Sequence, residues 1–385
     1  MIPQSRLDIE PGRRVNSLPW RGQFSPGLVE VLLQTYSEGG LVVDPFCGSG
    51  TTMIEAARAG LPSHGVEVNP AAQILASLYL LVNFHPSERE KALNRVFTRF
   101  AADRAASSDT GSLLRVVQES DEPLESLVAN AVFLLALKNG DTVLRRNLDR
   151  ALRLVSDLVE SLPDAGPELS IQLGDSRSIF VPDGQAGMVL TSPPYVNVFN
   201  YHQNYRKAVE LLGYGVLPAA RAEFGSNRKH RQNRFLTIIQ YAQDIGETLR
   251  ESLRAVRNGG VSVWVVGRES SVRGSAVPNP QIVYEMATGS GGLELVGKHE
   301  RKFRSRYGAL VYEDILVFRH VARAIEGVNP TLLGREVGCA VLGGLIASSD
   351  ETESEIAEAV SLADKVNPSA LPDHGRVSGQ RCLDR

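Results

Sequence analysis

The chain has 385 residues, of which 43% are hydrophobic and 22% are charged, and its formal net charge is −3. A chain of this size can bury a large core, and its small negative charge excludes a global electrostatic attraction to nucleic acid, so any such contact must come from local patches. Cys47, Cys339 and Cys382 have no metal-type spacing, and the sequence shows neither a run of about 18 apolar residues nor a basic segment followed by an apolar one at its start. We therefore expect a reduced, cytoplasmic protein with no metal and no membrane contact.

The first predicted elements are an arm and a helix. Residues 1–20 are polar and irregular, and we expect a mobile arm there. A helix is predicted to begin at Pro26, because proline suits a first helical turn, and to end before Gly39 and Gly40. Its apolar face consists of Leu28, Val29, Leu32 and Leu33.

The stretch LVVDPFCGSGTT predicts a buried strand, a glycine turn and a helix that begins near Thr51. Gly48 and Gly50 allow positive φ angles and let the backbone come close to a ligand, while free amides at the helix start favour a carboxylate or a polar group. The next predicted strand ends about twenty residues later at Glu67, where a carboxylate can bind two ribose hydroxyls. The combination predicts an adenosine-containing cofactor, although a tight turn without a ligand has the same local pattern. The glycine patterns typical of phosphate-binding loops and of dinucleotide sites are absent.

Residues 84–166 separate this half of the chain from the next strands, and their apolar residues repeat at helical spacing. We expect a helical insertion that extends the core, and the alternative is an element for target recognition or dimerisation. A short strand follows and ends at Asp175, which either caps a turn or faces a ligand.

The stretch MVLTSPPY contains the second informative pattern. Met188 to Leu190 predict the end of a buried parallel strand, and Pro193 and Pro194 cannot continue its pairing. The loop therefore leaves the sheet at the carboxyl end of a strand, which is where ligands bind in open α/β folds. We expect the Ser192 hydroxyl, the main-chain carbonyls and the ring of Tyr195 to converge there, an arrangement that suits a flat amine. An ordinary surface turn is the alternative.

Two basic segments follow the stretch MVLTSPPY. Residues 221–235 form a loop that either contacts phosphates or is a solvated face, and the candidate contacts are Arg228, Lys229, Arg231 and Arg234. A later antiparallel pair of strands is expected to close the sheet, with a second basic cluster at its turn, namely Arg301, Lys302, Arg304 and Arg306. Asn200 or Tyr201 could line a base pocket. Residues 323–385 predict two helices and a disordered tail.

The motifs DPFCGSGTT, GVEVNP and TSPPY together resemble those of the amino-methyltransferases of DNA, over roughly residues 20–82 and 168–320. In this chain the cofactor motif precedes the catalytic one, whereas many enzymes with SPPY have the opposite order. The resemblance implies a doubly wound, mostly parallel sheet of the class I methyltransferase type, and S-adenosylmethionine as cofactor. The expected divisions are an arm (1–20), a cofactor half (21–83), the insertion (84–166), a catalytic half (167–322) and C-terminal helices with a tail (323–385).

The resemblance also implies roles for single residues. Glu67 would hold the ribose of the cofactor and Asp175 would lie near its adenine amine. The other residues that would bind the cofactor are Phe24, Asp44, Pro45, Phe46, Gly48, Gly50, Thr51 and Thr191. The catalytic residues would be Ser192, Pro193, Pro194 and Tyr195, and we expect Ser192 within about 10 Å of the glycine turn, because direct transfer requires near contact.

The chemistry of an exocyclic amine explains this choice of residues. Its lone pair is conjugated with the ring, so acceptors on its two hydrogens would free the lone pair for attack on the sulfonium methyl group. We assign these acceptors to the Ser192 hydroxyl and the Pro193 carbonyl, and we expect Tyr195 to stack on a base flipped out of double-stranded DNA.

Several targets compete. Ser ahead of Pro-Pro-Tyr favours cytosine N4 by the resemblance, with adenine N6 as the main rival and guanine N2 of RNA as a more remote one. Transfer to cytosine carbon 5 is disfavoured, because that reaction uses a cysteine that typically follows proline and no cysteine here does so. A catalytically silent fold that binds nucleic acid is the alternative outside the enzymes. A partner restriction endonuclease is possible.

Overall fold

The structure, a computed structural model, describes residues 2–9, 16–103, 110–137, 143–164, 166–197, 201–226, 229–305, 308–321 and 328–372. Its centre is a seven-stranded sheet in the order β3-β2-β1-β4-β5-β9-β8. The first five of these strands pair in parallel, and β9 is antiparallel to both of its neighbours. The strands are β1 (Leu41–Asp44), β2 (Ser63–Glu67), β3 (Leu169–Leu173), β4 (Ala186–Thr191), β5 (Val256–Gly267), β8 (Leu293–Arg304) and β9 (Leu310–His320).

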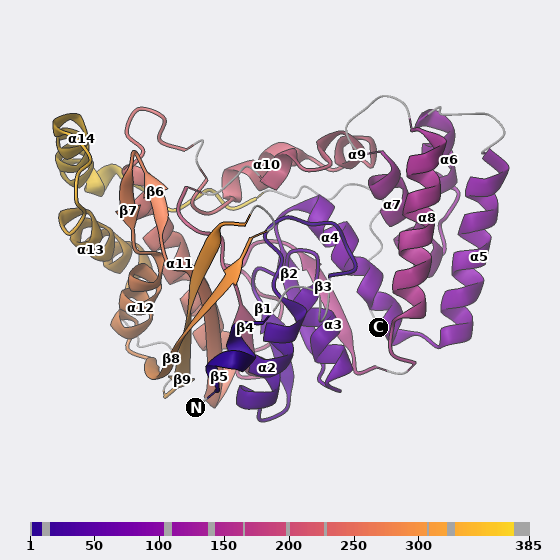
Figure 1. The fold of residues 1–385 in the computed structure, drawn as a ribbon, viewed down its shortest axis with the longest axis horizontal. Helices are drawn as coiled ribbons and strands as arrows, with labels where there is room; N and C mark the ends of the chain where they lie inside the picture. Colours follow the sequence, from indigo (N-terminus) through magenta and orange to yellow (C-terminus); the bar gives the residue numbers. More distant parts are fainter. Residues whose placement is uncertain are drawn as a thin grey trace.

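Helices cover both faces of this sheet (Figure 1). Successive side chains of a strand point to opposite faces, so Val263 and Val265 of β5 pack toward α2 and α3, while Trp264 and Val266 pack toward α11, α12 and α13. The doubly wound, mostly parallel sheet and its closing antiparallel pair are confirmed. The helices on the two faces are α2 (Pro26–Tyr36), α3 (Thr51–Arg58), α11 (Leu236–Ala255), α12 (Asn279–Gly289) and α13 (Pro330–Gly343).

The order in which the chain adds strands to the sheet reverses between β1 and β4, although the two strands are parallel. From β1 the chain continues to β2 and β3 on one side, and it later returns to β4 and β5 on the other side. The register pairs Val42 with Met188 and Val43 with Val189, so the carboxyl ends of β1 and β4 lie next to each other. This is the position at which an open α/β sheet binds its ligands.

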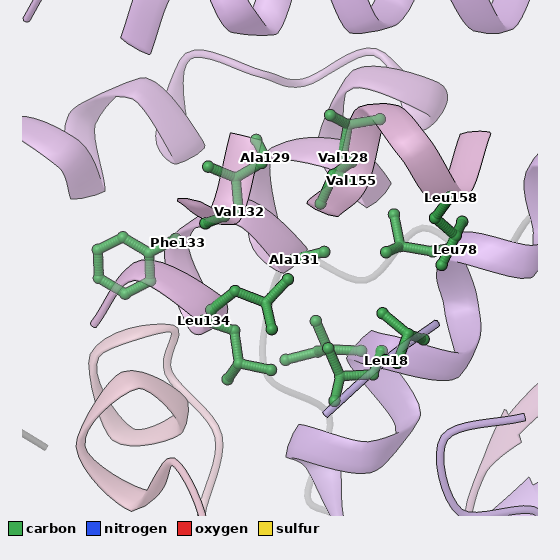
Figure 2. Packing of buried hydrophobic residues seen from close by; sticks show 14 of the residues in the cluster. Leu18, Leu78, Val128, Ala129, Ala131, Val132, Phe133, Leu134, Val155 and Leu158 are labelled. Atoms are coloured by element: carbon green, nitrogen blue, oxygen red, sulfur yellow. The ribbon is translucent and has the colours of Figure 1, made fainter. Parts of the chain in front are cut away.

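The insertion is a group of helices at one end of the molecule (Figure 1). Its central helix α7 buries Val128, Val132 and Phe133 completely, and these side chains belong to one cluster with Leu78 and Leu18 (Figure 2). The hydrophobic core therefore runs without interruption from the sheet domain into the insertion. The elements concerned are α4 (Pro70–Ser77), the 3-10 turn η1 (Leu78–Asn83), α5 (Pro86–Asp103), α6 (Thr110–Gln118), α7 (Pro123–Ala136) and α8 (Arg145–Glu160).

The amino-terminal arm differs from the expectation of a mobile segment in the residues that are described. Helix α1 (Gln4–Leu7) buries Leu7 against the sheet domain. Asp8 accepts a hydrogen bond from the Lys302 amide at 2.8 Å, and Gln4 donates one to the Glu300 carbonyl at 2.8 Å. The contact partners in β8 lie 294 and 296 positions later in the sequence, so a local sequence pattern could not reveal these contacts.

The carboxyl-terminal part packs beside α11 at the opposite end from the insertion (Figure 1). Val366 and Ser369 are buried there, so the tail that we expected to be disordered is packed as far as it is described; residues 373–385 lie outside the described ranges. The remaining elements are η3 (Tyr201–Gln203), α9 (Arg206–Leu211), α10 (Val216–Ala222), the hairpin β6 (Ser270–Val272) and β7 (Ser275–Val277), α14 (Asp350–Ser361) and η4 (Ala363–Lys365).

Candidate active site

Asp44 connects the two motifs at the carboxyl ends of β1 and β4. Its carboxylate accepts hydrogen bonds from Thr191 Oγ1 at 2.6 Å, Thr52 Oγ1 at 2.6 Å and the Phe46 amide at 3.0 Å. Burial raises the pKa of Asp44 to about 6, and these three hydrogen bonds oppose that shift. Through these hydrogen bonds the carboxylate holds the segment that contains the glycine turn against the end of β4.

The glycine turn has the backbone that its sequence predicts. Gly48 and Gly50 have φ angles of 54° and 88°, which side chains rarely adopt. A Cβ atom on Gly50 would also lie 2.8 Å from the Tyr79 ring. Only glycine can therefore make this turn without strain.

Glu67 faces the turn from the end of β2. One carboxylate oxygen accepts the Gly48 amide at 2.9 Å and the other accepts the Asn69 amide at 2.7 Å. Burial raises the pKa of Glu67 to about 7, and the two amides lower it. Because each oxygen has capacity for a further hydrogen bond, this pair of acceptors fits two adjacent ribose hydroxyls.

Ser192 lines the same cavity as the glycine turn. The lining combines six residues predicted for the site with six others, and three of these others, Trp20, Gly22 and Gln23, lie ahead of α2, where pattern alone does not reveal them. The predicted residues on this cavity are Phe24, Asp44, Phe46, Gly48, Thr51 and Ser192. The structure therefore brings the first and second motifs together around one site.

The segment that closes this cavity comes from the stretch PWRGQF ahead of α2. Gln23 donates hydrogen bonds to Ser49 Oγ at 2.6 Å and to the Leu18 carbonyl at 2.8 Å. The Trp20 ring stacks on Tyr201, with a centroid separation of 6.4 Å and an interplanar angle of 19°. The concentration of aromatic and amide side chains before Pro26 was the available signal for this role.

The two carbonyls of the catalytic loop differ. The Pro194 carbonyl accepts a hydrogen bond from the Tyr241 hydroxyl at 2.8 Å. Within the ranges that the structure describes, no donor reaches the Pro193 carbonyl. Pro193 is therefore the carbonyl that can accept a hydrogen bond from a bound molecule, and Tyr241 holds the loop in place from α11.

Tyr195 is half-buried, and contacts at its hydroxyl and along one side of its ring hold it in place. Its hydroxyl donates to Glu313 Oε1 of β9 at 3.2 Å, and a Cβ atom on Gly267 would lie 2.5 Å from the ring. Burial raises the pKa of Tyr195 well above its usual value, the Glu313 charge raises it further, and the Ser192 hydroxyl lowers it. The ring cannot turn without disturbing β5 and β9.

Asp175 does not line this cavity. Its carboxylate accepts bonds from Arg177 Nε at 2.8 Å and Arg177 Nη2 at 2.7 Å, and Arg177 also bonds to Asp244 of α11 at 3.1 Å. The Arg177 guanidinium lies 5.2 Å from the centre of the Phe224 ring, which in turn packs edge-on against Phe46. The role near the adenine amine stays a prediction.

The basic residues of the loop 221–235 lie in different surroundings in the structure. Lys229 donates to the Ser369 hydroxyl, and burial lowers its pKa while the Asp244 charge opposes that shift. Its ammonium is thus used inside the protein and not on a free surface, contrary to the phosphate contact expected for it. Arg231 and Arg234 line a separate pocket, and Arg228 lies outside the described residues.

The second basic cluster is also changed by packing. Arg301 is buried, pairs with Glu313 at 2.8 Å and lies over the Phe303 ring at 4.4 Å. The expected DNA-facing role is therefore wrong for Arg301. Arg304 donates to the Gly308 carbonyl at 3.0 Å, and Arg306 lies outside the described residues.

The amino-terminal half of this site matches a known protein family. Residues 8–76 match the sequence model of the family N6_N4_Mtase, described as a DNA methylase. This stretch of the chain is therefore similar to DNA methylases. Glu67 and the glycine turn lie within the matched residues.

Two curated relatives of the chain are both named Type II methyltransferases. M.MjaII of Methanocaldococcus jannaschii is 36% identical over 63 residues, which are 16% of this chain and 12% of that protein. M.BsoBI of Geobacillus stearothermophilus is 23% identical over 269 residues, which are 52% of each chain. The chain thus spans about half of one relative's length and much less of the other's.

Solved structures with a related fold include two methyltransferases. A SAM-dependent methyltransferase from Methanosarcina mazei has a TM-score of 0.37 at 10% identity, covering 78% of this chain and 99% of that one. A geranyl diphosphate C-methyltransferase from Streptomyces coelicolor has a TM-score of 0.35 at 10% identity, covering 77% and 75%. In the part of the chain that the structure describes, no helix is long and apolar enough to cross a membrane, and no group of three or more His, Cys, Asp or Glu could hold a metal ion.

Proposed function

We propose that the protein is a site-specific DNA methyltransferase that moves a methyl group from S-adenosylmethionine to the exocyclic N4 amine of a flipped cytosine. The observation that carries the proposal is the shared cavity of Ser192 and Gly48; the hydrogen bond from Thr191 to Asp44 connects the strands that precede these two residues. Direct transfer needs the amine and the methyl donor in near contact, and the shared cavity supports the proposal that they meet there.

The loop supplies acceptors for the amine. When bound, the cofactor supplies an electrophilic methyl group on a sulfonium. Ser192 Oγ and the free Pro193 carbonyl would each accept one hydrogen of the target amine and so free its lone pair. A nitrogen–carbon bond then forms as the sulfur–carbon bond breaks. The amine proton is acidic only after this step, so it can pass through Ser192 to solvent without a strong base.

The cytosine base must leave the duplex to reach this loop, because its amine is otherwise paired inside the helix. Tyr195 is the aromatic surface on which the flipped base would stack, and its fixed ring favours one orientation of that base. The same pair of acceptors suits the adenine N6 amine, and the preference for cytosine rests on Ser ahead of Pro-Pro-Tyr.

The test is incubation of the protein with DNA and labelled S-adenosylmethionine, followed by digestion and separation of the nucleosides. We expect N4-methylcytosine at a single sequence context in the wild type and no label with Ser192→Ala. Label in N6-methyladenine would replace the target base but keep the mechanism. Label in neither base, with cofactor bound, would refute the proposed function.

A restriction endonuclease with the same recognition site is the proposed partner, because both curated relatives are named Type II methyltransferases. DNA from cells that express the protein should resist that nuclease, and cleavage of fully methylated DNA would argue against the pairing.

A further inference from the structure

A second pocket lies beside the catalytic loop. It has a volume of about 200 Å³ and is lined by Asn197, Arg231, Arg234, Val272 and Arg273. These residues come from three segments: the end of the catalytic loop, the loop before α11, and the hairpin β6–β7. Asn197 follows Tyr195 by only two positions, so the pocket adjoins the loop that would hold the target base.

The pocket is strongly cationic. Arg231 and Arg234 have no acidic partner within the described ranges. Arg273 pairs with Glu355 of α14 at 3.1 Å, and its own side chain is half exposed. Three guanidinium groups thus share one carboxylate in a chain whose formal net charge is −3. An anion in the pocket would relieve their mutual repulsion.

The backbone around this pocket is unusual. Asn197, His230 and Arg273 have φ angles of 61°, 50° and 50°, and they are three of the four described residues other than glycine with positive φ. Arg273 and Gly274 form the two-residue turn between β6 and β7, a position where Asn-Gly is favoured. Arginine there costs backbone energy, and such strain concentrates at binding sites.

Neighbouring contacts hold the hairpin tip at the catalytic loop. Asn197 Nδ2 donates to the Ser271 carbonyl at 2.6 Å, and Ser348 Oγ donates to the Arg273 carbonyl at 2.7 Å. The tip is therefore fixed between the catalytic loop on one side and the segment joining α13 and α14 on the other. This gives the carboxyl-terminal helices a role in positioning Arg273.

We propose that Arg231, Arg234 and Arg273 form a clamp for a backbone phosphate of the DNA strand that carries the target base. The planar guanidinium fork matches a phosphate, and contacts to the backbone position the duplex without reading its sequence. Glu355 holds Arg273 in the free protein and competes with the phosphate. The inference rests on the proposed function, since it takes DNA as the substrate.

The test measures the affinity for a fluorescent DNA duplex by anisotropy at several salt concentrations. Each phosphate contact contributes about 1 to the slope of log affinity against log salt concentration. Because the three arginines share one phosphate, we expect Arg231→Gln, Arg234→Gln and Arg273→Gln each to lower that slope in part, the triple variant to lower it by about 1, and all of them to leave cofactor affinity unchanged. Arg273→Lys keeps the charge and should retain the slope.

Two further variants separate the clamp from a general effect of surface charge and from misfolding. Arg153→Gln removes an exposed arginine of α8, which lies at the opposite end of the molecule from β6–β7 (Figure 1), and should leave the slope unchanged. Glu355→Gln frees Arg273 and should tighten DNA binding several-fold, a gain that misfolding cannot produce.

The outcomes distinguish the two proposals. Salt-dependent DNA binding by the wild type, with unchanged slopes in all three glutamine variants, would overturn the clamp alone. A wild type without any salt-dependent DNA binding would overturn the proposed function as well.

Discussion

Thr191 donates a 2.6 Å hydrogen bond to Asp44, so the last residue of β4 is tied to the last residue of β1. Both side chains are buried, with exposed fractions of 0% and 2%. The next residue after Thr191 is Ser192, and the turn after Asp44 contains Gly48. One buried hydrogen bond therefore fixes the distance between the proposed acceptor of the amine and the turn that faces the cofactor.

Removing the hydrogen bond from Thr191 to Asp44 should lower both the stability of the protein and the rate of methyl transfer, whereas a matched control should lower only the stability. Thr191→Val keeps the shape but leaves a buried carboxylate oxygen with one partner fewer, at a cost of about 1–3 kcal/mol in the free energy of unfolding. Thr52→Val is the matched control, because it removes the other 2.6 Å threonine bond to Asp44 without crossing between strands. We expect similar losses in urea unfolding and a markedly slower methyl transfer only for Thr191→Val. Equal turnover in the two variants would contradict this.

Cofactor affinity should depend on pH through Glu67. Its pKa is raised to about 7, and ribose hydroxyls need the ionised carboxylate as acceptor. Below that pH the protein must first release the proton, so the dissociation constant should rise about tenfold for each pH unit well below 7 and level off above it. Calorimetric titration with the cofactor from about pH 5.5 to about pH 8, a range that spans the pKa of Glu67, measures how the dissociation constant depends on pH. A profile as steep in Glu67→Gln as in the wild type would remove Glu67 from this role.

The turn itself can be tested with two glycines. Gly50 and Gly60 both have positive φ, at 88° and 73°, but a Cβ atom meets Tyr79 at Gly50 and open space at Gly60. Gly60→Ala should cost about 1–2 kcal/mol of unfolding free energy from φ alone. Gly50→Ala should cost roughly 1–3 kcal/mol more, because the ring must move. Equal midpoints of chemical unfolding would show that the Tyr79 contact is unimportant.

The position of the Tyr195 ring can be changed from behind. The φ angle of Gly267 is not positive, so the backbone allows alanine there. The three atoms nearest to the new Cβ atom all belong to the Tyr195 ring, the closest at 2.5 Å. We expect Gly267→Ala to displace the ring and slow methyl transfer, with little further effect when Tyr195 is already alanine. A double-mutant cycle on the transfer rate should give a coupling of about 1 kcal/mol or more. Additive effects would mean that the ring position does not matter.

The elements around the cofactor could be predicted because their signals are local. A buried strand, a glycine turn and an acidic strand end lie within Leu41–Glu67, and the two prolines after Ser192 mark the end of the catalytic strand. The stacking of Trp20 on Tyr201 could not be predicted, since about 180 residues separate them. Lys229 shows the same limit: the sequence shows a charge run, but only the fold brings Ser369 and Asp244 to its ammonium.

The central claim is that Ser192 acts on the target amine beside a cofactor held by the glycine turn, and single-turnover kinetics of Ser192→Ala test it most directly. The account predicts that the dissociation constant of S-adenosylmethionine stays within about twofold, while the methyl-transfer rate falls about 100-fold or more, as when one preorganised partner is lost from an active site. A Ser192→Ala enzyme that transfers the methyl group at the wild-type rate would contradict it.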